Sequence, residues 1–379
     1  MSDSKECSDL SVLHVGAGRY RPGDSTHSTF NIWAELAKDF RRYTVVGRSI
    51  LSKEAFFSDK GVDVHLLASR MESEAEFLYT QFKGVKVAEQ AEADVVVAQC
   101  PVKGGMAGAR IGRKYGAKVL MEFHGHEYFA DNPKLSRNSI LALLTHQVLS
   151  RADRIRVLSE GMRQRLLDRY GATYESRTVV LPPRVDLGRF SKFKTDWNIE
   201  GRPIIALVGA VNGNKGQLRF LEAVSVANLN VEVWIVGNGP DLDACKEFAA
   251  RFSDARQVRF FGQIDHKKLA DLLPKADIMV MFSRSEGTPR AIMEGMAVGL
   301  PIVTTDAGFC SDIVQHGAQG FVLGDDPMEE VIARLEQLIG DDELRSQMGR
   351  SARARATQEY DSVSLFERYR DLIRETASA

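Results

Sequence analysis

The stretch SRSEGTPRAIMEGMAVGLP, residues 283–301, lies between two short apolar runs at residues 277–282 and 302–305. The apolar runs are typical of buried strands, and the polar residues after the first run predict a turn. Pro289 suits the first turn of a helix, because the N–H that proline lacks would have no partner there, and Gly299 ends that helix. The stretch therefore predicts strand, turn, helix and strand, the repeating unit of a parallel sheet.

Glu286 and Glu294 flank this predicted turn. The turn places backbone N–H groups and the positive end of a helix dipole at the carboxyl edge of the sheet, where phosphate binds well. Because phosphate repels a carboxylate, we expect the two glutamates to accept hydrogen bonds from hydroxyls, one on a sugar and one on a ribose. From the residues alone, the alternative is that Glu286 is a solvated loop residue and Glu294 only favours the helix start.

The pattern Glu286-Gly-x6-Glu294, followed by Gly-Met-Ala-x-Gly-Leu-Pro-Ile-Val, resembles the E-x7-E signature of family 4 glycosyltransferases. These are retaining enzymes with the GT-B fold. The resemblance implies an α/β fold class in which two Rossmann-like, doubly wound parallel-sheet domains face a cleft. It also implies that Glu286 contacts the donor sugar and that Glu294 contacts the ribose.

The length of 379 residues favours two domains. Strand-like and helical stretches alternate twice along the chain, which predicts one parallel sheet in each half. We expect an N-terminal domain on the acceptor side at residues 1–190 and a C-terminal domain on the donor side at residues 191–355. In GT-B enzymes a final helix, here residues 356–379, crosses back to the first domain.

A glycine-rich segment follows the first expected strand, and its Gly16 and Gly18 would let the backbone approach a pyrophosphate. Arg21 stands where a dinucleotide fingerprint has its third glycine, which argues against NAD. In the resembled family this loop reaches the donor phosphate, so Gly16 and Gly18 are predicted to bind the donor. The alternative is a tight turn without a ligand.

The segment that begins at Val208 resembles VGR-x4-KG, whose arginine and lysine clamp the diphosphate in the family. Lys215 matches the lysine, but Ala210 stands at the arginine position. One cation fewer weakens the stabilisation of the leaving group. Arg290, Arg284 and Arg19 are candidates to replace it, and we favour Arg290 because it lies in the first helical turn; an ordinary surface arginine is the alternative.

Further donor contacts are predicted around the same turn and in the first domain. Pro289 has no N–H to donate, so the amides of Gly287 and Thr288 are expected to bind phosphate. His124 and the glycine after it resemble the His-Gly segment of the family, whose histidine contacts the donor sugar. A helix cap or core-edge role is the alternative for a single histidine.

Gly237, after another apolar run, and Gln263-Ile264 also match family segments. The resemblance implies that Gly237 lies at a phosphate-side turn and that the backbone of Gln263 and Ile264 lies at the base. As plain turns these segments need no ligand. His124, Lys215 and Glu286 are the predicted catalytic residues.

Composition narrows the class of protein. The four cysteines are far apart and form no C-x-x-C pair, so the sequence predicts no zinc site or disulfide framework and suggests a reducing cytoplasm. Residues 1–190 contain 28 Lys+Arg and 23 Asp+Glu, against 22 and 28 in residues 191–379. The basic half suits peripheral contact with anionic lipid, although interspersed acidic residues favour a salt-bridged solvent face. No motif predicts nucleic-acid binding, and no apolar run reaches bilayer-spanning length.

The resemblance implies a retaining, metal-independent glycosyltransferase without a cofactor. It would move a hexose-type sugar from a nucleoside-diphosphate sugar to an acceptor hydroxyl on a glycan, a lipid-linked molecule or a small molecule. Lys215, the Gly287–Thr288 amides and the helix dipole would stabilise the departing diphosphate. A nucleotide-sugar epimerase or hydrolase of the same fold, or a sugar-binding protein without catalysis, stays open.

Overall fold

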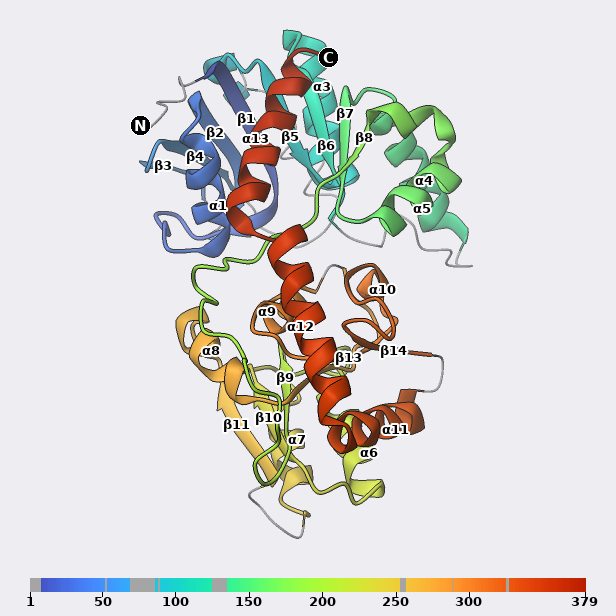
Figure 1. Cartoon of the computed structure of the whole chain (residues 1–379). Coiled ribbons are helices and arrows are strands. Elements are labelled where there is room, and N and C mark those ends of the chain that lie inside the picture. The colour runs from blue at the N-terminus through green and yellow to red at the C-terminus, as the bar shows by residue number, and fades with distance from the viewer. Residues whose placement is uncertain are drawn as a thin grey trace, which may run out of the picture. The chain divides into compact units, whose positions relative to one another are not determined.

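The computed structural model describes residues 8–51, 53–68, 86–87, 89–124, 135–252, 257–287, 289–324 and 327–379. The chain forms two compact units, one of residues 1–181 with 364–379 and one of residues 182–363 (Figure 1). Each unit has a sheet of its own. The predicted α/β class with two parallel-sheet domains is confirmed, whereas the predicted cleft between them stays a prediction.

The sheet of the first unit has the strand order β3-β4-β2-β1-β5-β6-β7-β8. Every pair is parallel except the edge pair of β3 and β4. The order reverses at β1, which lies between β2 and β5, as in a doubly wound sheet. The strands are β1 (Ser8–Tyr20), β2 (Phe40–Ser49), β3 (Ala55–Asp59), β4 (Val62–Leu67), β5 (Val95–Gln99), β6 (Lys118–Glu122), β7 (Arg154–Val157) and β8 (Thr178–Val180).

Helices from both ends of the chain cover this sheet. The last helix, α13, packs Leu365, Tyr369 and Leu372 against the same core as Val12 of β1 and Val95 of β5 (Figure 1). The helices of the unit are α1 (Ser28–Ala37), the π-helix η1 (Cys100–Gly105), α3 (Met106–Tyr115), α4 (Leu135–Leu149), α5 (Glu160–Tyr170), the 3₁₀ helix η3 (Ala172–Arg177) and α13 (Ser362–Ala377). The C-terminal helix is thus part of the first core.

The sheet of the second unit is entirely parallel, with the order β11-β10-β9-β12-β13-β14. Successive residues of β12 enter opposite cores, Met279 on one face and Ile278 and Val280 on the other, as expected of a sheet covered by helices on both faces. Its strands are β9 (Ile204–Val208), β10 (Glu232–Val236), β11 (Val258–Gly262), β12 (Ile278–Met281), β13 (Ile302–Thr305) and β14 (Gly320–Leu323). Its helices are α6 (Gln217–Val226), α7 (Leu242–Ala249), α8 (His266–Leu272), η5 (Leu273–Lys275), α9 (Arg290–Ala297), α10 (Cys310–Ile313), α11 (Pro327–Gly340) and α12 (Asp342–Glu359).

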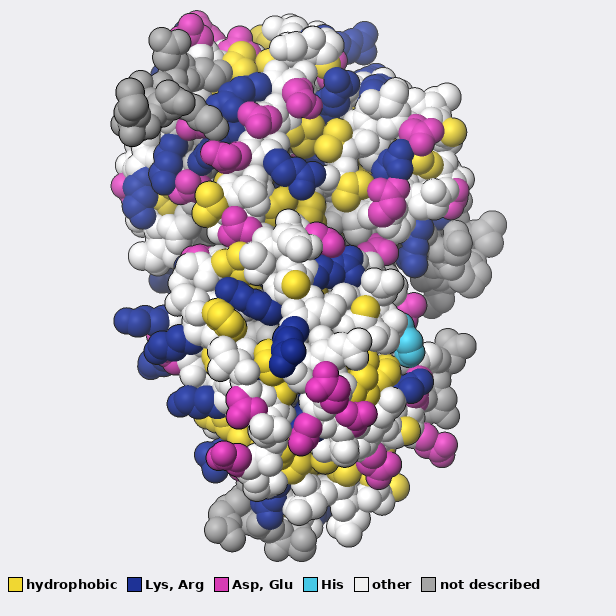
Figure 2. Space-filling model, in the orientation of Figure 1, with side chains coloured by type: hydrophobic (Ala, Val, Ile, Leu, Met, Phe, Trp, Pro, Cys, Tyr) yellow, Lys and Arg dark blue, Asp and Glu magenta, His cyan; other side chains and the backbone are white. Residues whose placement is uncertain are grey.

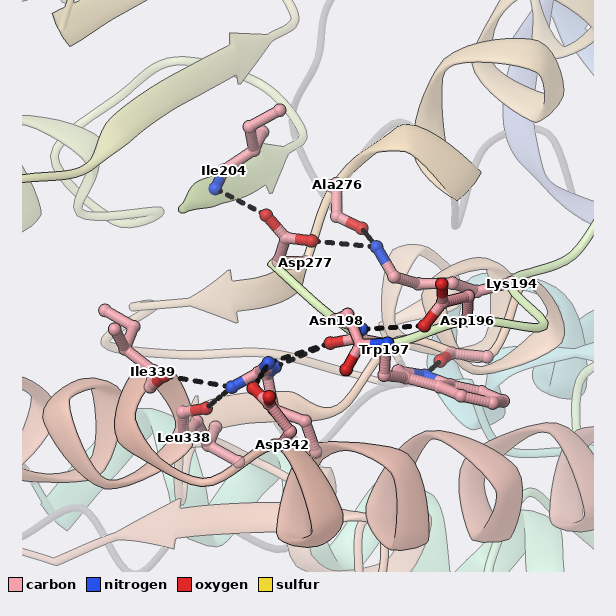
Figure 3. A network of polar contacts seen from close by, with 12 residues as sticks. Lys194, Asp196, Trp197, Asn198, Ile204, Ala276, Asp277, Leu338, Ile339 and Asp342 are labelled. Carbon is pink, nitrogen blue, oxygen red and sulfur yellow. Dashed lines mark hydrogen bonds and ion pairs between the residues drawn. The ribbon is translucent and has the colours of Figure 1, made fainter. Parts of the chain in front are cut away.

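A polar network holds the segment before β9 against the second unit (Figure 3). Lys194 Nζ lies 2.8 Å from Asp277 Oδ1, and both side chains are nine-tenths buried. Trp197 Nε1 donates to Gly299 O at 2.8 Å, and the fully buried Arg345 donates to Trp197 O at 2.8 Å. Buried charges are tolerated only with such partners, so this segment is a fixed part of the second unit.

The predicted domain boundaries therefore differ from the observed ones. Val185 and Phe190 are buried in a core of the second unit, so residues 182–190 belong to it rather than to the first domain. Ala356 and Tyr360 lie in the same core. The part of the chain that joins the first unit begins at residue 364, not at 356.

Basic and acidic side chains are interspersed on the face shown in Figure 2. In the first unit, Lys114 pairs with Glu89 at 2.8 Å, and Arg163 pairs with Glu160 at 2.5 Å and Glu175 at 2.9 Å. These pairs match the expectation of a salt-bridged solvent face, and lipid contact stays a prediction. Over the described ranges, no helix is both long enough and apolar enough to cross a membrane.

Candidate functional site

The second sheet reverses its strand order at β9, which pairs with β10 on one side and β12 on the other. In doubly wound sheets, ligands bind beyond the carboxyl ends of the strands at such a reversal. The loop after β9 carries Lys215, and the loop after β12 carries Glu286. The topology thus brings the predicted lysine and the first predicted glutamate to one edge.

Lys215 and Glu286 form an ion pair between these two loops. Lys215 Nζ lies 2.5 Å from Glu286 Oε1, with side chains 24% and 8% exposed. Ser283 Oγ donates to the same oxygen at 2.6 Å, and Thr305 Oγ1 donates to Ser283 O at 2.5 Å. Because charge-assisted hydrogen bonds are the stronger ones, the pair fixes an ammonium group and a carboxylate side by side at the sheet edge.

Local sequence explains why the β9 loop reaches the β12 loop. Asn212 Oδ1 accepts from the backbone N–H groups of Asn214 and Lys215 at 3.1 and 3.0 Å, which forms an Asx turn. Asn214 Nδ2 then donates to Ser285 O at 2.8 Å, and Arg284 N donates to Asn214 O at 2.7 Å. One backbone hydrogen bond and one from the Asn214 side chain hold the two loops together, and this brings Lys215 close to Glu286.

Two positions must be glycine because the backbone of another segment approaches them closely. Gly216 caps α6 with φ +73°, and a Cβ there would lie 2.2 Å from Phe282 O. Gly237, with φ +141°, follows β10, and its Cβ would lie 1.9 Å from Gly209 O. A side chain at either position would separate the loops. The predicted turn at Gly237 is present, but its glycine already has a packing reason, so its phosphate contact stays a prediction.

Helix α9 starts one residue later than predicted, since Pro289 is its N-cap and Arg290 its first residue. Glu294, 13% exposed, places Oε1 3.3 Å from Nδ1 of His266 at the start of α8. Arg290 is exposed. Gly287 follows Glu286 in the loop, and Thr288 lies outside the described residues. His266 was not predicted, because nothing in its local sequence distinguishes it from a surface histidine.

Gln263 and Ile264 form the link between β11 and α8. Gln263 is exposed, and Ile264 is half-buried against the core. His266 starts α8 two residues after this link, and its Nδ1 lies 3.3 Å from Glu294 Oε1. The structure thus brings the start of α8, and not Gln263 or Ile264 directly, to the predicted ribose-binding residue.

Gly16 and Gly18 lie within β1, which runs on to Tyr20, so the predicted loop after a shorter strand is wrong. The Tyr20 ring occupies the space beside them: a Cβ would lie 3.2 Å from its hydroxyl at Gly16 and 2.8 Å at Gly18. A Cβ at Gly47 of β2 would lie 2.7 Å from the same ring. Burial raises the pKa of Tyr20 to about 12. The glycines thus make room for a tyrosine, and their donor contact stays a prediction.

His124 follows β6 in the first unit, and its ring lies next to the buried carboxylate of Glu122. His124 Nε2 lies 3.2 Å from Glu122 Oε2, with side chains 35% and 0% exposed. Glu122 Oε1 accepts from Arg156 Nη1 at 2.6 Å and from the Tyr369 hydroxyl. Arg156 belongs to the basic residues expected on a salt-bridged solvent face, but it is buried beside Glu122. A charged residue inside an apolar run was the signal, because a buried charge needs a partner.

In the cluster of Glu122, His124, Arg156 and Tyr369, burial and neighbouring positive charge have opposite effects on the pKa of the carboxyl group. Burial alone would raise the pKa of Glu122, but the Arg156 guanidinium and the His124 ring hold that pKa well below its usual range. Burial and the Glu122 charge raise the pKa of Tyr369 well above its usual value. Nearby, His14 is fully buried with Nδ1 2.9 Å from the Tyr43 hydroxyl, and burial lowers its pKa to about 4. The group therefore contains a carboxylate and a guanidinium among neutral neighbours.

Two family models match the chain: glycosyl transferases group 1 over residues 190–355 and the glycosyl transferase 4-like domain over residues 26–184. Each match covers less than half of the chain; with the two doubly wound sheets, the two matches together indicate a GT-B glycosyltransferase of the GT4 type. The first range contains Lys215, Glu286 and Glu294, and the second contains His124.

Individual relatives are distant. N-acetyl-alpha-D-glucosaminyl L-malate synthase of Bacillus anthracis is 27% identical over 144 residues, 38% of this chain and 37% of that protein. The chain thus spans little more than a third of that relative. GDP-mannose-dependent alpha-(1-6)-phosphatidylinositol monomannoside mannosyltransferase of Mycobacterium tuberculosis is 23% identical over 275 residues, 68% of this chain and 70% of that protein. Among solved structures, Anabaena HepE in complex with UDP has a TM-score of 0.75 at 18% identity, covering 97% of this chain and 100% of that one.

Proposed function

We propose that the chain is a retaining glycosyltransferase that moves a hexose-type sugar from a nucleoside-diphosphate sugar to an acceptor hydroxyl. The observation that carries this proposal is the Lys215–Glu286 pair, 2.5 Å apart at the reversal point of a doubly wound sheet. A cation there suits a diphosphate, and a carboxylate with a second oxygen suits a sugar hydroxyl.

In this proposal each predicted residue of the second unit has one task. Lys215 and the Gly287 amide stabilise the charge that develops on the departing diphosphate. Glu286 accepts a hydrogen bond from the donor sugar, and Glu294 accepts one from the ribose. Arg290, exposed on the first turn of α9, supplies the cation that is missing at Ala210.

The reaction needs no carboxylate as acid or base. The bond between the anomeric carbon and the diphosphate breaks, and the electron pair leaves with the phosphate oxygen. The acceptor oxygen bonds to the anomeric carbon on the same face, and its proton passes to the leaving phosphate. His124, Lys215 and Glu286 position and stabilise the reacting groups in an oxocarbenium-like transition state, and the proposal includes no metal or cofactor.

The comparisons bear on the class of the donor. A GDP-mannose-dependent relative and a UDP-bound structural neighbour support a nucleotide sugar as the donor class. They differ in the base, so the base stays open. The acceptor is a glycan, a lipid-linked molecule or a small molecule, and a cytoplasmic location with peripheral membrane contact is part of the same proposal.

Donor screening tests the proposal. The melting temperature of the protein is measured with UDP-, GDP- and ADP-sugars, because a specific ligand stabilises the folded state according to its concentration relative to Kd. The stabilising donor is then incubated with candidate acceptors, with and without EDTA, and the anomeric configuration of the product is read by NMR. Retained configuration in EDTA supports the proposal. Donor consumption without any acceptor indicates an epimerase or hydrolase, and an inverted product contradicts retention.

A further inference from the structure

We propose that Glu122 holds His124 in the tautomer protonated on Nε2, so that Nδ1 is the nitrogen offered to a ligand. Arg156 and Tyr369 are positioning residues in this arrangement. They act on Glu122 and not on the ligand. The contacts that support this proposal all lie within the first unit.

The two oxygens of Glu122 have different partners. Oε1 accepts from Arg156 Nη1 at 2.6 Å and from the Tyr369 hydroxyl. Oε2 faces His124 Nε2 at 3.2 Å. The two donors on Oε1 fix the rotation of the carboxylate and leave Oε2 to the histidine.

The chemistry of the carboxylate then decides the tautomer. An ionised carboxylate only accepts hydrogen bonds, so the histidine nitrogen that faces it must donate. The tautomer of a histidine is set by the hydrogen bond that its other nitrogen makes. A neutral His124 with a proton on Nε2 has a lone pair on Nδ1, which is then an acceptor for a hydroxyl.

The positioning residues are themselves anchored. Arg156 Nε donates to Leu181 O at 3.1 Å, and its guanidinium lies 4.4 Å from the centre of the Tyr369 ring. Tyr369 belongs to α13, so the last helix of the chain supplies one of the two donors on Oε1. His14, buried and neutral beside the group, does not compete with Arg156 as a cation for the carboxylate.

The use of Nδ1 rests on the proposed function. If His124 contacts the donor sugar, Nδ1 accepts a hydrogen bond from a sugar hydroxyl. In the other tautomer Nδ1 carries a proton and can only donate to the hydroxyl oxygen, so the hydroxyl must turn and can no longer donate its own proton to His124. The tautomer itself does not depend on the reaction, so the two statements are tested by separate measurements.

The tautomer is read from the ring-nitrogen chemical shifts of the ¹⁵N-histidine-labelled protein at mildly alkaline pH. His124→Asn identifies the His124 signals by their loss. In the wild-type protein we expect a protonated Nε2 and an unprotonated Nδ1 for His124. The opposite pattern overturns the proposal, and this measurement needs no change in the buried group.

Glu122→Gln is the decisive variant. Its amide oxygen stays with Arg156 and Tyr369, because both are donors, and its NH₂ group then faces Nε2. We expect the proton of His124 to move to Nδ1 and kcat/KM to fall about 10–100-fold, as for other groups that orient a histidine. Unchanged His124 signals in a folded Glu122→Gln protein overturn the proposal.

A pair of buried tyrosine variants separates positioning from general destabilisation. Tyr369→Phe removes one donor on Oε1 and should broaden or shift the His124 signals. Tyr174→Phe is the matched control, since the buried Tyr174 hydroxyl lies 3.3 Å from Nδ1 of a different histidine, His146. Equal effects of the two variants on His124 contradict positioning by Tyr369. A shifted tautomer in Glu122→Gln with unchanged turnover contradicts the use of Nδ1 by the sugar, whereas a wild-type protein without transferase activity contradicts only the proposed function.

Discussion

Lys215 and Glu286 stand 71 residues apart in the sequence, and Lys215 Nζ meets Glu286 Oε1 at 2.5 Å. Each residue lies in a loop after a central strand, and the backbones of the two loops are hydrogen-bonded to each other. These hydrogen bonds between the loops fix the position of the ammonium group. A fixed cation beside a diphosphate reduces the reorganisation needed in the transition state.

Lys215→Ala should lower kcat about 10²–10³-fold, as the loss of one stabilising donor does in other enzymes. The side chain is partly exposed, so the fold should survive the change. Steady-state rates with the donor found by screening measure the effect. Lys246→Ala, at an exposed ion pair with Asp243 in the same unit, is the matched control and should leave the rate unchanged. A Lys215→Ala protein with near-normal turnover would refute the assigned role.

Glu294→Gln should raise the KM for the donor about 10–100-fold with little change in kcat, because a hydrogen bond from a charged group is worth about 1.5–3 kcal/mol. The ribose contact is made in both the ground state and the transition state. Donors that lack the 2′- or 3′-hydroxyl test the contact directly. The wild-type protein should discriminate against one of them, and Glu294→Gln should not; equal discrimination by both proteins rules out a ribose contact.

Arg290→Ala should lower kcat about tenfold or more if Arg290 replaces the cation missing at Ala210. Ala210 is exposed, so Ala210→Arg can be added without a steric clash in the core. We expect Ala210→Arg to restore activity in the Arg290→Ala background and to change it little in the wild type. A simple sum of the two single effects in the double-mutant cycle would show that the two positions are independent.

Arg345→Met should destabilise the second unit by about 1–3 kcal/mol for each buried carbonyl that loses its donor. Arg345 is fully buried and donates to the carbonyls of Trp197 and Leu338. Urea unfolding measures the change. Arg350→Met on the same helix is the control, since this exposed guanidinium lies 5.5 Å from the Trp197 ring centre, a contact worth about 0.5–1 kcal/mol. Similar losses in both variants would contradict the special role of Arg345.

Stability should fall between pH 7 and pH 5 because of His14. Burial lowers its pKa in the folded state to about 4, while its pKa in the unfolded chain is about 6.5. The unfolded chain therefore binds more protons in this window, and stability rises with pH by about 2 kcal/mol from pH 5 to pH 7. His14→Gln should flatten this dependence in urea unfolding. A slope as steep as that of the wild type would mean that other groups cause it.

The local and the repeated features of the structure could be predicted from the sequence. The βα alternation predicted both sheets, and the turn between Ser283 and Pro289 predicted where Glu286 and Glu294 would lie. The order of strands within the second sheet then brings Lys215 to Glu286, a contact that the sequence did not predict.

Contacts between distant segments could not be predicted from local patterns. Nothing near Tyr369 in the sequence indicates that its hydroxyl binds Glu122, 247 residues away. The predicted loop at Gly16–Gly18 was wrong for the same reason. A glycine pattern shows that a Cβ is excluded, but only the fold shows that the Tyr20 ring lies in the space that a Cβ would enter.

The place of α13 also determines when the first unit can form. Its Leu365, Tyr369, Leu372 and Ile373 complete a core whose strands begin at residue 8, yet the whole second unit is translated between them. Domains usually fold in the order of their synthesis. The core of the first unit is completed only after α13 has been synthesised. A ribosome-bound nascent chain should therefore show a folded second unit before a folded first unit.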